Sequence, residues 1–174
     1  MHRLALTVAL VALMAGGTQA SEAASSLRCE LRVVGQYSPA PGRPEAGSGP
    51  WLEMTLRNPG AKAIRFLNWG TPFEGGWFQP FVQVSLDGAT ITYGGAMVKR
   101  GDPEASDYVL LKSGASRRAR LDLAEVFDLS RSGRYRVEPR ITLHDVIEGD
   151  SPRLRPLSMH QMRSLDCLAV EFVR

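Results

Sequence analysis

Apolar and polar residues alternate one by one in short runs along most of this chain, and that pattern restricts the fold to β-strands. A period of two puts the apolar side chains on one face of a strand, whereas an amphipathic helix repeats them every three or four residues. In the first run every second residue is apolar, namely Leu27, Cys29, Leu31 and Val33. Further predicted strands occupy residues 52–56, 64–66, 82–86, 89–93, 107–112, 119–123, 135–143 and 165–173.

Turn-forming residues separate the runs and indicate the class of β fold. Asp87-Gly88 joins two alternating runs directly and predicts a two-residue hairpin, because this turn needs positive φ at both central residues. After Gly133, Tyr135 enters a strand in a way that resembles the tyrosine corner of immunoglobulin-like sandwiches, with a plain half-buried tyrosine as the alternative. The seven to nine short strands predict an all-β fold, an immunoglobulin-like antiparallel β-sandwich.

The amino-terminal residues carry the features of an export signal. A positive start is followed by an apolar run from Leu4 to Met14 and by the small-residue pattern Thr18-Gln19-Ala20, which together predict a cleavable signal peptide over residues 1–20. The apolar run is too short to span about 30 Å of hydrocarbon as a helix, although an uncleaved anchor is the alternative. We therefore expect a single domain of residues 21–174, periplasmic or extracellular, with no stable membrane insertion after cleavage.

Two cysteines, Cys29 and Cys167, stand near the two ends of the expected mature chain. In an oxidising compartment such a pair most often forms a disulfide. Two free thiols or a metal site are the alternatives. The two cysteines and the histidines His144 and His160 have no recognised zinc-ligand spacing. We therefore predict a Cys29–Cys167 disulfide and no bound metal or other cofactor.

Charge and motif content argue against two further classes of function. The 21 basic and 18 acidic residues give a net charge of +3, spread along the chain, whereas a nucleic-acid binder shows a concentrated basic stripe. The sequence motifs of zinc peptidases, serine hydrolases and phosphate-binding loops are absent. The segment 144–148 combines a histidine with carboxylates, but it follows a predicted strand and we expect a surface loop. The sequence thus predicts a protein that is not an enzyme and does not bind nucleic acid.

Several segments of the central region occur in an order that suggests a family. They are residues 67–75 (LNWGTPFEG), Asp87-Gly88, residues 93–100 (YGGAMVKR) and residues 127–130 (FDLS). Over about residues 50–140 this order resembles the amino-terminal pro-region of secreted deuterolysin-like metallopeptidases of the peptidyl-Lys type. The pieces Thr-Pro-x-Glu-Gly and Val-Lys-Arg are the most specific.

The resemblance does not extend to the zinc-binding catalytic domain that follows the pro-region in such peptidases. The chain has instead a last predicted strand that bears Cys167. The resemblance therefore implies the role of the pro-region, which is to fold beside a protease and cover its active site, and does not imply peptidase activity. It makes a secreted metallopeptidase the expected partner.

An inhibitor of this kind needs a rigid scaffold that presents an exposed segment. Met97, Val98, Lys99 and Arg100 lie between two predicted strands and hold the only Lys-Arg pair of the chain. If the target prefers lysine, Lys99 would fill the pocket that binds a substrate lysine. A solvated loop is the alternative.

A second candidate binding surface is the aromatic-rich loop that contains Trp69, Phe73, Trp77 and Phe78. Packing of these rings over an open end of the sandwich is the alternative. Two functions follow from the sequence: a stand-alone inhibitor or folding partner of a secreted metallopeptidase, or an extracytoplasmic immunoglobulin-like binding or envelope structural module. Fold alone does not separate the two.

Overall fold

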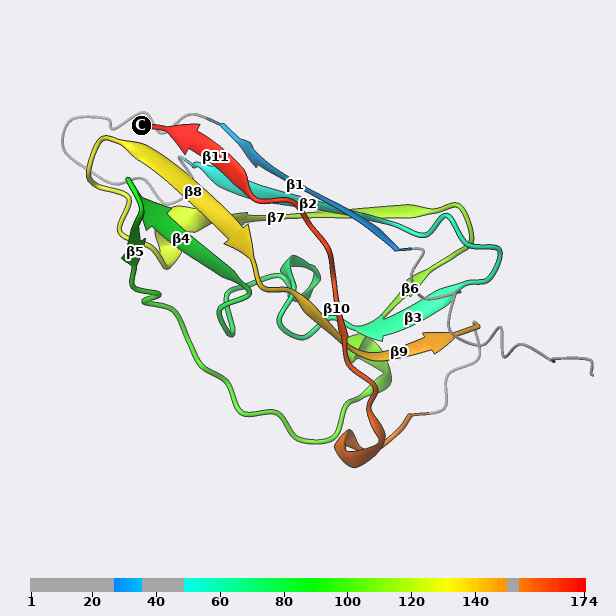
Figure 1. Ribbon diagram of the computed structural model, residues 1–174. Coiled ribbons are helices and arrows are strands. Elements are labelled where there is room, and N and C mark those ends of the chain that lie inside the picture. Colours follow the sequence, from blue (N-terminus) through cyan, green and yellow to red (C-terminus); the bar gives the residue numbers. More distant parts are fainter. Residues whose placement is uncertain (1–26, 36–48, 150–153) are drawn as a thin grey trace, which may run out of the picture.

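The computed structural model describes residues 27–35, 49–149 and 154–174. Within these ranges eleven strands form three antiparallel sheets, and the only helical pieces are single 3₁₀ turns (Figure 1). The predicted all-β, sandwich-like fold is confirmed. The predicted signal peptide, residues 1–20, lies outside the described residues.

The first sheet has the strand order β1-β2-β7. Its strands are β1 (Arg28–Val34), β2 (Trp51–Arg57) and β7 (Ser116–Asp122). The alternation of β2 sends Leu52, Met54 and Leu56 into the core, where all three are fully buried. Their neighbours on the strand face the other way, so the period of two seen in the sequence is the inside-outside pattern of this sheet.

The other two sheets have the orders β10-β9-β3-β6 and β11-β8-β4-β5. The former contains β3 (Ile64–Leu67), β6 (Tyr108–Leu111), β9 (Thr142–Glu148) and β10 (Arg163–Ser164). The latter contains β4 (Val82–Leu86), β5 (Ala89–Ile91), β8 (Arg134–Pro139) and β11 (Val170–Val173). The 3₁₀ turns are η2 (Pro72–Glu74), η3 (Ala105–Asp107), η4 (Leu123–Glu125) and η5 (Leu157–Met159).

The strand number differs from the expected seven to nine for two reasons. The run 135–143 was predicted as one strand, but it is divided into β8 and β9, which belong to different sheets. Between the two strands, the Arg140 N–H donates to the Phe81 carbonyl, and the Ile141 carbonyl accepts from the Leu165 N–H. The backbone thus leaves the hydrogen-bonding pattern of one sheet before it enters that of the other. The second reason is the two-residue strand β10.

The predicted turns form as expected. Asp87 and Gly88 have φ values of 49° and 87° and connect β4 to β5. Tyr135 is fully buried, and its hydroxyl donates to the Arg131 carbonyl at 2.5 Å. This bond back to the preceding loop is the tyrosine-corner arrangement. Tyr135 also stacks on Phe172 of β11, with ring centroids 4.9 Å apart.

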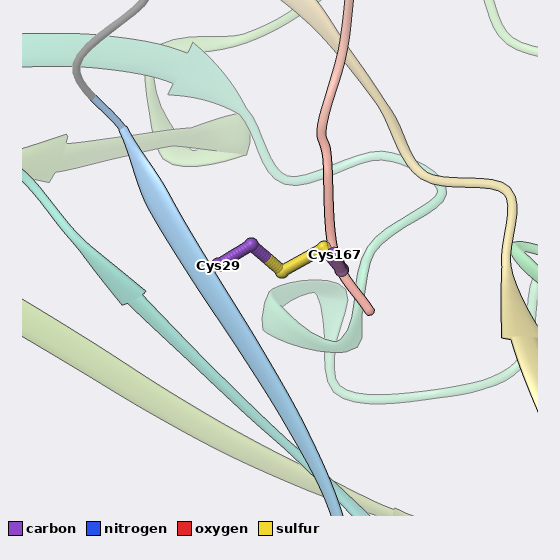
Figure 2. Close-up of a disulfide and its surroundings, with 2 residues drawn as sticks. All are labelled: Cys29 and Cys167. Atoms are coloured by element: carbon purple, nitrogen blue, oxygen red, sulfur yellow. A yellow bond between two sulfur atoms is a disulfide. The ribbon is translucent and has the colours of Figure 1, made fainter. Parts of the chain in front are cut away.

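The predicted disulfide is present and closes the fold. Cys29 of β1 is bonded to Cys167, with 5.0 Å between their Cα atoms (Figure 2). The bond joins residues 138 positions apart in the sequence, so it attaches the carboxyl-terminal segment to the first sheet. Leu168 lies inside the strand predicted over residues 165–173, but it is 86% exposed, because β11 begins only at Val170.

Candidate functional site

The two candidate binding segments of the sequence lie against each other in the structure. We name residues 97–100 the basic segment and residues 69–78 the aromatic loop. The Val98 N–H donates to the Phe78 carbonyl at 3.0 Å. The Tyr93 hydroxyl lies 3.1 Å from the carbonyl oxygens of Trp77 and Ala96. The basic segment belongs to the long connection between β5 and η3, which Figure 1 shows on the side of the molecule away from β1, β2 and β7.

The Thr-Pro-x-Glu-Gly piece of the aromatic loop folds into η2. The Thr71 side chain caps this turn by accepting from the Phe73 N–H at 3.2 Å, and Pro72 begins it. Glu74 reaches back and accepts from the Gly70 N–H at 3.0 Å. The turn thereby holds the Glu74 carboxylate in a fixed position, with only 7% of the side chain exposed.

Arg100 is the residue that joins the basic segment to the aromatic loop. Its guanidinium forms an ion pair with the Glu74 carboxylate. The same guanidinium lies over the rings of Trp69 and Phe78, 5.4 Å from each centroid, where cation–π attraction adds to the ion pair. Arg100 is therefore an anchor of the segment.

The four aromatic residues of the loop differ in how deeply their side chains are buried. Trp77 stacks on Phe81 with ring centroids 4.5 Å apart, and its Nε1–H donates to the Asp122 carbonyl at 2.8 Å. Trp69 and Trp77 are each only 6% exposed. Phe73 packs edge-on against Phe66 of the core. A partner could therefore reach Phe78, which is 37% exposed, but not the two indole rings unless the loop opened.

The other three residues of the basic segment point into solvent. Met97 is 75% exposed and Val98 is 41% exposed. Lys99 is also exposed, and no hydrogen bond or ion pair joins its ammonium group to another residue of the described ranges. From the sequence, both Lys99 and Arg100 were candidate binding residues; in the structure Arg100 is the anchor and Lys99 is the displayed charge.

A buried charged cluster lies where a surface loop was expected. Residues 144–148 belong to β9, and Asp145 is fully buried with a φ of 47°. Its carboxylate accepts from the Tyr108 hydroxyl at 2.5 Å and pairs with Arg155, and His160 lies 3.9 Å away. The expectation of a surface loop was wrong, because a β-bulge opposite β3 turns Asp145 toward partners from β6 and the segment around η5.

The electrostatics of this cluster keep Tyr108 protonated. Burial raises the pKa of the Tyr108 hydroxyl, and the hydrogen bond to Asp145 raises it further. The hydroxyl is therefore a permanent donor to the carboxylate. With Arg155 on its other oxygen, Asp145 fastens the segment around η5 to the sheet of β3, β6 and β9. The sequence signal for the cluster was the adjacent pair His144-Asp145 between the apolar residues Leu143 and Val146.

A polar pocket of about 440 Å³ opens beside the aromatic loop. It is formed by the loop after Phe78, the division between β8 and β9, and β10. Its lining residues are Gln79, Arg140, Thr142, His144, Met162 and Ser164. The pocket thus has donors from an amide, a guanidinium, an imidazole and two hydroxyls, and none of its lining residues is acidic.

Comparison with known proteins gives one partial relative. No protein-family model matches the chain. A stretch of 86 residues is 37% identical to a protein named extracellular protease from Aeromonas hydrophila. The match covers 49% of this chain and 24% of that protein, so the chain spans about a quarter of its relative. Part of this chain is similar to part of an extracellular protease.

This similarity and the disulfide both indicate an exported protein. Among the residues that the structure describes, no helix is long and apolar enough to cross a membrane. In the same ranges no group of three His, Cys, Asp or Glu side chains is placed to hold a metal ion.

His144 makes the stability of the domain depend on pH. Burial lowers the pKa of His144 below its ordinary value of 6.5, and the charge of His160 lowers it further. The unfolded chain therefore binds a proton at a higher pH than the folded chain does. We expect the free energy of unfolding to fall as the pH drops below 6.5. In urea unfolding at pH 7.5, 6.5 and 5.5, His144→Gln should lose less stability on acidification than the wild-type protein, and equal losses would contradict this assignment.

Proposed function

We propose that this chain is a secreted, non-catalytic domain that inhibits a secreted metallopeptidase, or assists its folding, in the manner of a stand-alone pro-region. The observation that carries the proposal is the exposed Met97-Val98-Lys99 stretch, which Arg100 fixes to a rigid, largely buried loop. The similarity of half of the chain to part of an extracellular protease supports it.

A rigid display of the basic segment favours inhibition. Binding a flexible loop costs conformational entropy, and a loop that is already fixed avoids much of this cost. The Val98–Phe78 hydrogen bond and the Arg100–Glu74 ion pair fix the two sides of Lys99. Lys99 would then enter the pocket that binds a substrate lysine, with Met97 and Val98 in contact with the rim.

The two segments that carry the pro-region resemblance contact each other in the structure. The two most specific pieces of this resemblance, Thr-Pro-x-Glu-Gly and Val-Lys-Arg, are 26 positions apart when measured from Glu74 to Arg100. The Arg100–Glu74 ion pair joins them, so the residues that carry the resemblance form one structural unit. In the proposed function this unit is the support of the inhibitory segment, and it has no catalytic role.

The proposal predicts that the wild-type protein inhibits a Lys-specific secreted metallopeptidase, or the extracellular protease purified from Aeromonas hydrophila medium, at micromolar concentration or below. We expect Lys99→Ala to weaken inhibition at least tenfold, because a residue that fills a central pocket typically contributes about 2 kcal/mol or more. Residual peptidase activity against a Lys-containing substrate measures both effects. Lys112→Ala removes another exposed lysine and is the matched control.

Each possible result bears on a different part of the proposal. Absence of inhibition and of binding by the wild-type protein would reject the protease partner and favour the extracytoplasmic immunoglobulin-like module. Equal inhibition by the wild-type protein and Lys99→Ala would leave the partner in place but reject Lys99 as the residue in the pocket. A refolding assay of the denatured peptidase, with and without this domain, tests the folding-helper form of the proposal.

A further inference from the structure

The basic segment is too small to account for a stable complex by itself. Specific protein–protein interfaces bury about 800 Å² on each partner and involve about 20–30 residues a side. The basic segment, residues 97–100, supplies only four of these residues. If the proposed inhibitor binds a peptidase, neighbouring surface must take part in the contact.

Exposed apolar side chains indicate where that surface lies. Of the ten large apolar residues that are exposed in the described ranges, three belong to the basic segment and the end of the aromatic loop, and four belong to the segment 154–162. The latter are Leu154, Leu157, Met159 and Met162, with exposed fractions of 51%, 41%, 60% and 67%. A gathering of exposed apolar residues is typical of interaction sites, and flexible methionine side chains suit a protein contact.

Two observations place these segments close together in the structure. The Leu157 N–H donates to the Asp102 side chain at 3.3 Å, two residues after the basic segment. Met162 and Gln79 line the same pocket, and Gln79 follows Phe78, the residue to which Val98 is hydrogen-bonded. The pocket therefore lies between the basic segment and the segment 154–162.

The segment 154–162 is held firmly enough to be a binding surface. Arg155 pairs with the fully buried Asp145, and the His160 imidazole lies 2.9 Å from the Arg155 carbonyl with its side chain only 4% exposed. These polar anchors point inward, while Leu157, Met159 and Met162 stay in solvent. The cluster around Asp145 thus fixes the backbone of a segment whose apolar side chains are largely exposed.

The chemistry of the pocket indicates what it accepts. Arg140 supplies a cation, and Gln79, Thr142, His144 and Ser164 supply polar groups that can donate hydrogen bonds. Arg140 also contacts Gln83 at 3.2 Å and lies 3.9 Å from Glu138, yet 61% of its side chain stays exposed. A cation with several neutral donors and no acidic lining residue is complementary to a carboxylate.

We propose that this pocket receives an aspartate or glutamate side chain of the peptidase, and that the segment 154–162 forms the second half of the contact surface. The inference rests on the proposed function, because it concerns the same partner. It assigns two points of contact to the complex. Lys99 enters the active site of the peptidase, and a carboxylate of the peptidase enters the pocket of this domain.

Charge substitutions at Met162 test the inference, because Met162 lines the pocket and is mostly exposed. Binding to the peptidase is measured by titration. We expect Met162→Glu to weaken binding at least tenfold, because it places a second negative charge beside the bound carboxylate, whereas Met162→Lys should bind as tightly as the wild-type protein or more tightly. Leu168→Glu introduces the same charge at another exposed apolar residue and should have no effect.

Arg140→Gln provides an independent measurement. It should weaken binding about tenfold and reduce the salt dependence of the dissociation constant, while Arg136→Gln, an exposed arginine of β8 outside the pocket, should do neither. Equal weakening by Met162→Glu and Met162→Lys, or unchanged binding by Arg140→Gln, would overturn the carboxylate site while wild-type binding persisted. Failure of the wild-type protein to bind would instead reject the proposed function, and this inference with it.

Discussion

The double variant Cys29→Ser/Cys167→Ser should lose about 4–5 kcal/mol of its free energy of unfolding. The disulfide joins residues 138 positions apart, and a crosslink that closes a loop of this length removes a large conformational entropy from the unfolded chain. The total free energy of unfolding of a native protein is about 5–15 kcal/mol. The variant should therefore be only marginally folded at 37 °C. Guanidinium chloride unfolding at 25 °C measures the difference.

The wild-type protein in a reducing buffer is the natural control for this variant. Its unfolding curve should move toward that of the double variant, because both lack the same crosslink. A loss below about 1 kcal/mol in both would mean that the strands hold the carboxyl-terminal segment without the disulfide. In that case the Phe172–Tyr135 stack and the pairing of β11 with β8 would be the contacts that hold the carboxyl-terminal segment in place.

Asp145→Ala should destabilise the domain by about 3–5 kcal/mol. Removal of one member of a buried ion pair leaves its partner with an uncompensated charge. Asp145 is fully buried and the Arg155 side chain is 26% exposed, while Tyr108 loses the acceptor of its hydrogen bond. Urea unfolding gives the magnitude, and proteolysis near residues 154–160 shows whether this segment is released first.

Two further substitutions give the comparisons for Asp145→Ala, one inside the buried cluster and one at a surface ion pair. Tyr108→Phe removes only the hydroxyl donor and should cost about 1–3 kcal/mol. Glu171→Gln disrupts an ion pair with Arg136 on the surface, at 3.3 Å, and should cost less than about 1 kcal/mol. If Asp145→Ala is no more harmful than Glu171→Gln, the buried cluster does not hold the segment, and the support that we assign to the second contact surface is absent.

The candidate site was only partly predictable from the sequence. Composition and loop position identified the basic segment and the aromatic loop separately. Whether Trp69 and Trp77 are buried depends on Arg100, which lies over Trp69, and on Asp122 of the first sheet, which is bonded to Trp77. Both partners are far from the two indole rings in the sequence. The pocket could not be predicted from the sequence for the same reason. Gln79 and Met162 are far apart in the sequence and are brought together only by the folding of β8, β9 and β10.

Features of the fold that depend on local sequence patterns were predicted correctly. The period of two gave the strands and their inward faces, Asp87-Gly88 gave a hairpin, and two cysteines gave the disulfide. Neighbouring residues decide the strands and the hairpin, because side-chain direction and turn geometry are set within a few positions. The disulfide was predictable for another reason, since the chain has only two cysteines to pair.

Which charged side chains are exposed and which are held in place could be seen only in the folded protein. Lys99 and Arg100 are adjacent and chemically similar, yet Arg100 alone reaches Glu74 and two rings. Asp145 reads as a polar interruption of a strand, yet it is buried because Tyr108 and Arg155 surround it. The environment of a charge depends on residues that are distant along the chain, and the positions of those residues follow from sheet register and not from local sequence.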